Sequence, residues 1–174
     1  MRRILAIVVL CLVAACSSTA PTTYRDQATP ITSKALFEPA RYAGLWYEIA
    51  SYPTSFQRGC TKTQARYDVI DTQTLGILNS CERNGAISQI KGKGRIVGPG
   101  RLEIKFASVP FVKAPYWVLW VDEDYQTAVV GTPSGRAGWI LNRGPRIRDD
   151  RLQAAKDILA FNGYDLSQLE MTPQ

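Results

Sequence analysis

Histidine is absent from this sequence of 174 residues. Its absence excludes histidine-based acid–base catalysis, catalytic triads that contain histidine, and histidine metal ligands. Clusters of basic residues are also missing, because 21 basic and 15 acidic side chains lie scattered along the chain, with a formal charge of +6. Since nucleic-acid binding normally requires a clustered basic patch, we expect no nucleic-acid partner. No nucleophile lies beside a base, so we also expect no enzymatic activity, no metal and no cofactor.

Apolar runs long enough to span a membrane are absent as well, and a short apolar run lies near the start of the chain. Ile4–Ala15 follows two arginines and contains twelve residues, whereas a membrane-spanning helix needs about 20. A charged start, a short apolar run and small residues at its end are typical of a secretory signal. We therefore predict a signal peptide over residues 1–15.

The residue after this segment is Cys16. The stretch "VAAC" resembles the lipobox of bacterial lipoproteins, in which the signal is cut before a cysteine that carries diacylglycerol and an N-acyl chain such as palmitate. This resemblance implies that Cys16 is lipidated, and an ordinary signal with a chance cysteine at its cleavage site is the alternative. Ser17 follows the cysteine, where aspartate would imply retention in the inner membrane. We expect a lipid-anchored protein of the cell outer membrane that faces the periplasm.

Residues 16–35 are rich in serine, threonine and proline and show no apolar periodicity. This composition predicts a flexible tether between the lipid anchor and a domain at 36–174.

Only four cysteines are present. Cys11 lies in the predicted signal and Cys16 is the predicted lipid site, which leaves Cys60 and Cys81. In an oxidising compartment this pair favours a disulfide. Two buried free thiols, or a nucleophilic Cys60, are the alternatives.

From residue 44 onward, polar and apolar residues repeatedly alternate. In "RLEIKFA", for example, Leu102, Ile104 and Phe106 alternate with charged side chains. A period of two with one polar face predicts antiparallel strands, and turn signals such as "RNGA" and "TPSGRAG" separate them. The pattern predicts eight strands, at 44–51, 61–70, 74–82, 86–97, 101–107, 115–122, 126–132 and 137–143.

A helix should follow the strands. Asp149 can cap a helix that runs through Phe161, and Gly163 suits its C-terminal end. A short extended piece is expected near Leu169. Eight strands with short connections favour an all-β, up-and-down antiparallel barrel with a C-terminal helix, because closure removes exposed sheet edges.

Closure would give the barrel an interior with room for side chains or one small ligand. The predicted inward face includes small residues, which suggest space that protein atoms do not fill. Inward glycines can also mark bulges or kinks. These small residues are Ala65, Ala86, Gly92 and Gly94.

Three motifs in order resemble those of the lipocalin family. "GLWYEIA" contains Gly44 and Trp46, "DEDYQTA" contains Asp124 and Tyr125, and "WILNRGP" contains Arg143. Together with the lipobox and "F-x-R-G" at Phe56–Gly59, they are similar to the bacterial outer-membrane lipoprotein lipocalins of the Blc type, relatives of apolipoprotein D. The resemblance spans roughly 37–171 and implies that Trp46 plugs the closed end of the barrel, under Arg143.

The resemblance also implies a hydrophobic ligand, a fatty acid or lysophospholipid, that is held in the barrel for storage or transport at the outer membrane. The loops at 53–60 and 107–115 should form the mouth. Glu48 should point inward by strict alternation, with no partner assignable from sequence. The candidate ligand contacts are Tyr52, Phe56, Tyr67, Ile90, Phe106, Phe111, Tyr116, Trp120 and Trp139.

Other functions remain open at this point. A structural or interaction lipoprotein would have a barrel filled by its own side chains. An enzyme in a lipocalin-like barrel would need a catalytic group that the sequence does not mark. A haem or tetrapyrrole carrier would need tyrosine or cysteine as axial ligand. A homodimer is left open by the sequence.

Overall fold

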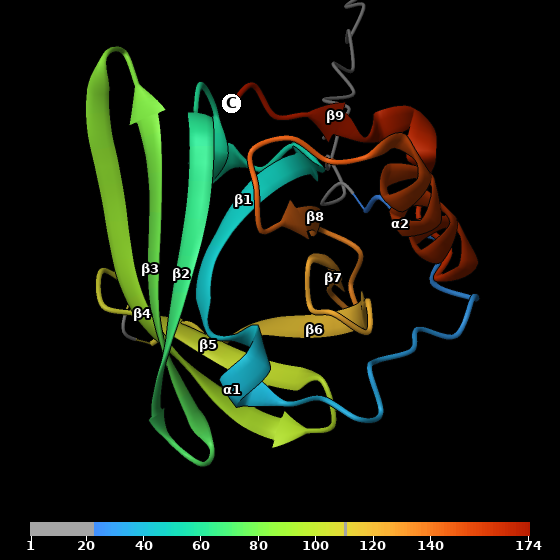
Figure 1. The fold of residues 1–174 in the computed structure, drawn as a ribbon, viewed down its shortest axis with the longest axis horizontal. Helices are drawn as coiled ribbons and strands as arrows, with labels where there is room; N and C mark the ends of the chain where they lie inside the picture. The colour runs from blue at the N-terminus through green and yellow to red at the C-terminus, as the bar shows by residue number, and fades with distance from the viewer. Residues whose placement is uncertain (1–22, 110) are drawn as a thin grey trace, which may run out of the picture.

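The computed structural model describes residues 23–109 and 111–174. The predicted signal peptide and Cys16 lie outside these residues and remain predictions. All eight strands expected from the alternating pattern are present, together with the expected helix and a ninth, short strand (Figure 1). The strands are β1 (Gly44–Ser51), β2 (Thr61–Asp71), β3 (Thr74–Arg83), β4 (Ala86–Gly98), β5 (Arg101–Phe106), β6 (Ala114–Val121), β7 (Thr127–Gly131), β8 (Gly138–Asn142) and β9 (Glu170–Met171). The helices are α1 (Pro39–Tyr42) and α2 (Asp149–Phe161), and two short 3-10 helices are η1 (Ser55–Gln57) and η2 (Leu166–Gln168).

The sheet closes on itself. Each strand from β2 to β8 pairs antiparallel with the next, β8 pairs with β1, and β1 pairs with β2 over Gly44–Tyr47. Closure leaves few unpaired backbone groups at a sheet edge. The predicted all-β, up-and-down barrel is therefore confirmed.

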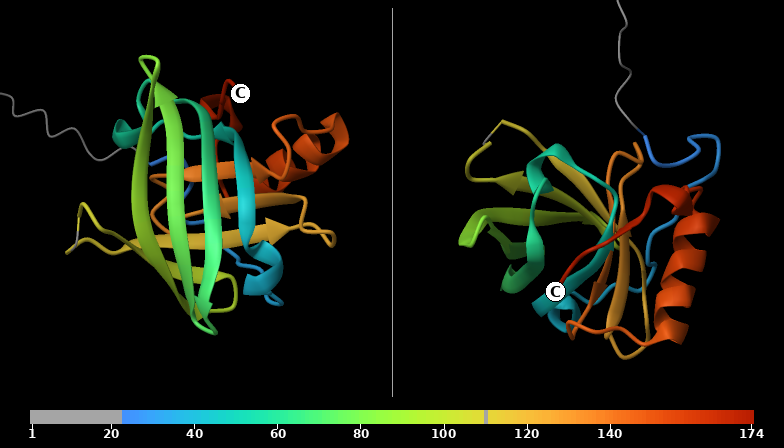
Figure 2. Two further views of the ribbon diagram at one scale, coloured as in Figure 1. Left: turned by 60° about the vertical axis from the view of Figure 1, so that its left-hand side comes forward. Right: turned by 90° about the horizontal axis from the view of Figure 1, so that it is seen from above.

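Two apolar clusters stabilise this arrangement. An inner cluster around Trp46 lies inside the barrel, and an outer cluster lies between the barrel wall and α2. Ala155 and Leu159 are four residues apart on one face of α2, and both are fully buried against the wall. Figure 2 shows α2 lying outside the ring of strands. The helix therefore covers the barrel without entering its interior.

The N-terminal end of α2 differs slightly from the prediction, and the C-terminal end agrees with it. The helix begins at Asp149, and its N-cap is Arg148, whose side chain makes no capping hydrogen bond. Asp149 therefore lies in the first turn, where its negative charge interacts favourably with the positive end of the helix dipole. At the other end the N–H of Gly163 donates to Ala160 O at 2.9 Å, and Gly163 has a φ of +81°. Glycine adopts this left-handed conformation without steric cost, as expected for that position.

The segment 23–35 differs from the predicted free tether. Tyr24 and Arg25 are buried, and Tyr24 N–H donates to Gly135 O at 2.7 Å. Lys34 N–H donates to Val118 O at 2.8 Å. Arg25 Nε also donates to Asn162 O at 3.0 Å, and the Tyr24 ring joins the outer cluster. Isolated contacts of this kind leave no apolar period in the sequence. The chain therefore joins the domain well before residue 36.

Two β-bulges reverse which face some aromatic residues occupy. The register of β1 shifts between Glu48 and Ala50, and that of β6 shifts between Val118 and Trp120. A bulge places one extra residue on one strand, so later side chains switch faces. Tyr52 and Trp120 consequently belong to the outer cluster beside α2. The prediction that both face the interior is wrong for this reason.

The C-terminal residues complete the wall near the open end. Beyond Tyr47, β1 leaves β2 and pairs with β9 instead. Thr172 N–H donates to Ile49 O at 2.9 Å, and Lys62 N–H donates to Pro173 O at 2.7 Å. The last residues thus bridge β1 and β2 where these strands separate.

A disulfide joins Cys60, just before β2, to Cys81 on β3, with the two Cα atoms 5.4 Å apart. This separation lies in the usual range for disulfides. The bond favoured for this pair is confirmed, and the free-thiol alternatives are set aside. No helix among the described residues is both long and apolar enough to cross a membrane.

Candidate functional site

The floor of the barrel is built on Trp46. Its side chain is fully buried, its Nε1 donates to Tyr42 O at 2.7 Å, and the guanidinium carbon of Arg143 lies 3.8 Å from its ring centroid. Gly44 has φ of +100°, and a Cβ there would lie 3.1 Å from Arg143 Nη1. Glycine therefore permits both the turn and the close approach of the arginine. Arg143 also donates to the carbonyls of Arg41, Ala43, Leu45 and Tyr125.

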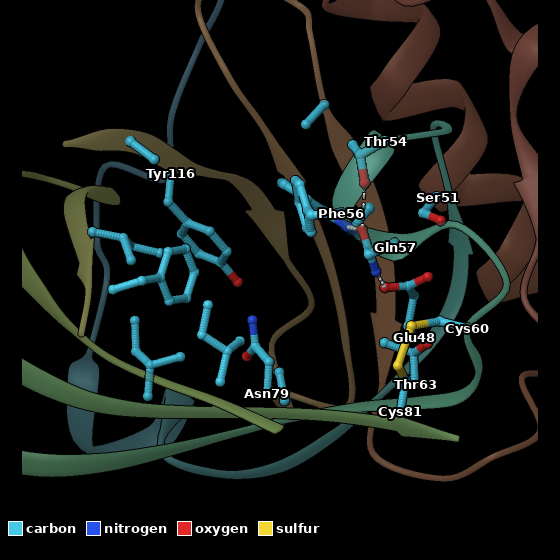
Figure 3. A pocket seen from close by; sticks show the side chains of 18 of the residues that line it. Glu48, Ser51, Thr54, Phe56, Gln57, Cys60, Thr63, Asn79, Cys81 and Tyr116 are labelled. Atoms are coloured by element: carbon cyan, nitrogen blue, oxygen red, sulfur yellow. Dashed lines mark hydrogen bonds between the residues drawn. A yellow bond between two sulfur atoms is a disulfide. The ribbon is translucent and has the colours of Figure 1, made fainter. Parts of the chain in front are cut away.

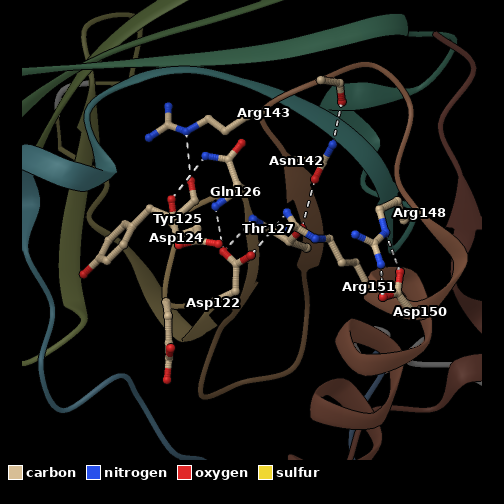
Figure 4. A network of polar contacts seen from close by, with 12 residues as sticks. Asp122, Asp124, Tyr125, Gln126, Thr127, Asn142, Arg143, Arg148, Asp150 and Arg151 are labelled. Atoms are coloured by element: carbon tan, nitrogen blue, oxygen red, sulfur yellow. Dashed lines mark hydrogen bonds and ion pairs between the residues drawn. The ribbon is translucent and has the colours of Figure 1, made fainter.

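The β6–β7 turn supports this floor (Figure 4). The Asp122 carboxylate accepts the N–H groups of Gln126 and Thr127 at 2.6 and 2.9 Å and pairs with Arg151 at 3.3 Å. Asp124, the residue singled out by the motif, contributes its backbone carbonyl to Gln126 Nε2. Sequence reasoning missed Asp122, although aspartate is a usual residue at the start of a turn.

Tyr125 links the same turn to the N-terminal approach of β1. It has a positive φ of +54°, and its hydroxyl accepts the N–H of Glu38 at 2.9 Å. The Arg41 guanidinium carbon lies 4.3 Å from the centre of its ring. The structure thus brings the motif residues together around the closed end.

Above the floor lies a neutral cluster of three tyrosines. The Tyr116 hydroxyl is 2.7 Å from the hydroxyls of both Tyr42 and Tyr67. Burial raises the pKa of all three phenols, so they stay protonated across the physiological range. The bottom of the interior is therefore aromatic and uncharged.

A hollow of about 1320 Å³ extends from this cluster to an open mouth (Figure 3). Three of the candidate contacts do not line it: Tyr52 and Trp120 face α2, and Phe111 is 98% exposed at the tip of the β5–β6 loop. The candidates that line it are Phe56, Tyr67, Ile90, Phe106, Tyr116 and Trp139.

The inward glycines do not create this space. A Cβ on Gly92 would lie 2.8 Å from Lys105 O and 3.0 Å from the Phe106 ring, so the ring lies over that glycine. A Cβ on Gly94 would lie 3.1 Å from Leu102. The expectation that these residues mark empty volume is wrong, because neighbouring side chains use the room. Ala65 does line the hollow, whereas Ala86 is exposed.

One wall of the hollow is polar and centres on Glu48. Its carboxylate accepts from Gln57 Nε2 at 2.6 Å and from Thr172 Oγ1 at 2.8 Å. Gln57 Oε1 in turn accepts from Trp139 Nε1 at 3.1 Å and from Thr54 Oγ1 at 3.1 Å. The inward direction predicted for Glu48 is thus observed. Its partners come from η1 and from a residue 124 positions away, which no local pattern indicates.

Further polar atoms on this wall lack a partner. Thr63 Oγ1, Asn79 Oδ1 and Arg83 Nε are buried without a hydrogen bond among the described residues, and all three residues line the hollow. Leaving such an atom unpaired costs about 1–3 kcal/mol. A molecule with polar groups at this level of the hollow would recover part of that cost.

Burial raises the pKa of the Glu48 carboxyl above its ordinary value of 4.5, although hydrogen bonds from Thr172, Ser51 and Gln57 oppose the shift. Because the folded-state pKa is the higher one, the stability linked to this proton is fully present below the unfolded-state pKa and is lost as pH rises through the folded-state value. We expect Glu48→Gln to remove this loss, as measured by urea denaturation at about pH 4, 6 and 8.

Glu103→Gln is the matched control for Glu48→Gln. Glu103 lies at the surface with its side chain 29% exposed, and Lys113 lowers its pKa through a hydrogen bond and its charge. Its stability contribution is present above the unfolded-state pKa and is lost as pH falls, which is the opposite sign. If the pH profiles of the wild-type protein and Glu48→Gln ran parallel, the raised pKa of Glu48 would be refuted.

These features define a closed antiparallel barrel with an aromatic floor and a hollow that opens at one end. The family of lipocalin-like domains matches residues 37–174. Temperature-induced lipocalin-1 of Arabidopsis thaliana is 37% identical over 144 residues, which cover 77% of each protein. The outer membrane lipoprotein Blc of Escherichia coli K12 is 34% identical over 160 residues, which cover 90% of this chain and 87% of that protein.

Solved structures agree on the fold. Lobster apocrustacyanin A1 superposes with a TM-score of 0.68 over 78% of each chain, at 18% sequence identity. The chain belongs to the lipocalin family, whose members bind small hydrophobic ligands.

Proposed function

We propose that the hollow binds a single-chain amphiphile, a fatty acid or lysophospholipid, for lipid storage or transport at the outer membrane. The observation that carries this proposal is the gradient along the hollow. Its bottom is lined by neutral aromatic rings, and its upper wall carries buried polar atoms without partners. An acyl chain at the bottom would gain about 0.8 kcal/mol for each buried CH₂.

The head group would lie beside the polar wall. Arg83 Nε donates and the Thr63 hydroxyl can donate or accept, whereas Asn79 lies deeper, opposite Ala65 in the β2–β3 ladder. Arg83 can pair with a carboxylate or phosphate, and Thr63 can pair with a hydroxyl. A wholly apolar ligand would leave all of these atoms unpaired.

The location at the outer membrane rests on two supports. The predicted lipidation of Cys16 would tie the domain to a membrane, and Blc, a relative over most of the chain, is an outer membrane lipoprotein. The open hollow counts against a barrel filled by its own side chains. The single buried carboxyl of the site, in a sequence without histidine, supports a binding protein rather than an enzyme.

Lipid analysis of the purified protein tests the proposal. Organic extraction followed by mass spectrometry should recover about one single-chain lipid for each protein molecule. Oleate and a lysophospholipid should then each displace a fluorescent fatty acid from the stripped protein. Neither co-purified lipid nor uptake of added lipid would refute the carrier function.

A further inference from the structure

We propose that the mouth of the barrel is a docking surface for a lipid bilayer that contains anionic lipids, so that the hollow opens toward the membrane. The surface consists of the η1 loop (53–60) and the β5–β6 loop (107–109 and 111–113). This inference extends the proposed function, because it states how a ligand would pass between bilayer and barrel.

Exposed apolar side chains gather on these two loops. Phe56 is 63% exposed and Phe111 is 98% exposed, and Val109 and Val112 on the same loop as Phe111 are also exposed. Phe56 and Val109 line the mouth of one hollow, so the two loops lie on the same end of the barrel. Single exposed apolar residues are common, but two phenylalanines and two valines around one opening form a patch that favours a partner. Phenylalanine and other apolar side chains of membrane-surface segments enter the boundary between head groups and acyl chains.

The charges around the mouth fit an anionic surface. Five cationic side chains line the hollow and its mouth, against two carboxylates, and one of these, Glu48, is buried. Lys113 also pairs with Glu103 beside the mouth at 3.0 Å, so an excess of positive charge remains. Basic side chains close to a membrane are attracted to its anionic lipids. The five cationic residues are Arg58, Arg83, Lys91, Lys113 and Arg136.

The closed end carries exposed apolar residues too, because Val69 and Ile70 are 50% and 52% exposed in β2. The turns at 68–74 and 122–126 at this end contain acidic residues and no base. Basic side chains nevertheless lie beside both turns: Arg66 pairs with Asp68, and Arg151 pairs with Asp122. Arg41 and Arg143 stack on rings of the same end. Charge alone therefore does not choose between the two ends.

The path of the N-terminal chain favours the mouth as the end that faces the membrane. Thr23 Oγ1 donates to Ser134 O at 2.9 Å, and the Tyr24 hydroxyl donates to Pro53 O at 2.7 Å, so the described chain begins beside the mouth. Six residues separate Cys16 from Thr23. Even fully extended, this stretch spans at most about 25 Å at 3.3–3.6 Å per residue.

That reach is shorter than the barrel. The 13 residues of β4 span about 40 Å, or about 28–33 Å along the barrel axis at the usual strand tilt. A lipid on Cys16 could therefore hold the mouth at a membrane but could not let the closed end rest on it.

Vesicle binding by an unlipidated chain tests the surface without the anchor. The barrel closes and both apolar clusters form within residues 23–174, so a protein of residues 17–174 keeps the whole described fold. Co-sedimentation would compare vesicles of phosphatidylcholine alone with vesicles that contain about one-third phosphatidylglycerol. We expect tighter binding to the anionic vesicles. Phe111→Ser should weaken this binding about tenfold, the order expected for one partly buried phenyl ring.

Val69→Ser is the matched control, because it removes an exposed apolar side chain from the closed end, and it should leave vesicle binding within about twofold. Equal weakening by both variants, or no preference for anionic vesicles, would overturn the proposal. So would a mouth-to-mouth dimer in sedimentation velocity that Phe111→Ser dissociates, if the wild-type protein ignored vesicles.

Ligand binding keeps this test separate from the carrier function. Phe111 does not line the hollow, so Phe111→Ser should bind the fluorescent fatty acid as the wild-type protein does. Absent vesicle binding with intact fatty-acid binding would refute only the docking surface. Intact vesicle binding without any lipid uptake would refute only the carrier function.

Discussion

Replacing Trp46 with alanine should lower the free energy of unfolding by about 3–5 kcal/mol, the usual cost of removing a large buried aromatic side chain. The indole is fully buried at the floor of the barrel. Its removal leaves Tyr42 O without its donor and takes away the ring on which Arg143 stacks. Urea denaturation followed by far-UV circular dichroism gives the measurement.

Trp117→Ala is the matched control for the floor. Its ring also lies beneath an arginine, with the Arg101 guanidinium carbon 4.2 Å from the centroid, but the side chain is only half-buried on the outside of the barrel. A stacked arginine contributes about 0.5–1 kcal/mol at such exposed sites. We expect Trp117→Ala to cost less than half of the loss caused by Trp46→Ala. Equal losses would show that arginine stacking, rather than burial at the floor, accounts for the effect.

The barrel could be predicted because its physical causes are local. Alternation with a period of two follows from the pleat of a strand, so β5, with Leu102 and Ile104 inside, is readable from six residues. The closed end could be predicted through the motif resemblance, since Gly44 and Trp46 are placed relative to each other by one strand. Arg143 meets them because β8 pairs with β1.

Other parts depend on causes that leave no local trace. A bulge changes no residue type, yet it turns Tyr52 and Trp120 from the expected interior to the outer cluster. Glu48 is paired by Thr172, which only the folded chain brings near. Similarly, the segment 23–35 docks through backbone hydrogen bonds that composition cannot reveal.

Ala65→Trp should weaken the binding of long-chain ligands about 30-fold. Ala65 pairs with Trp46 in the β1–β2 ladder and lines the hollow just above the floor. An indole there would occupy the place of the last two or three CH₂ groups of an acyl chain. Losing their burial costs about 2 kcal/mol at 0.8 kcal/mol each, which corresponds to about 30-fold in the dissociation constant.

A chain-length series shows whether the ligand tail reaches the floor. In Ala65→Trp, competition by long fatty acids should weaken while competition by chains a few carbons shorter stays unchanged, because a shorter tail ends above the new indole. Arg66→Trp, on the adjacent outward and exposed position of β2, should bind every chain length as the wild-type protein does. A loss in Ala65→Trp that is independent of chain length would mean that the tail lies elsewhere. The aromatic floor would then close the barrel without limiting the length of the acyl chain that binds.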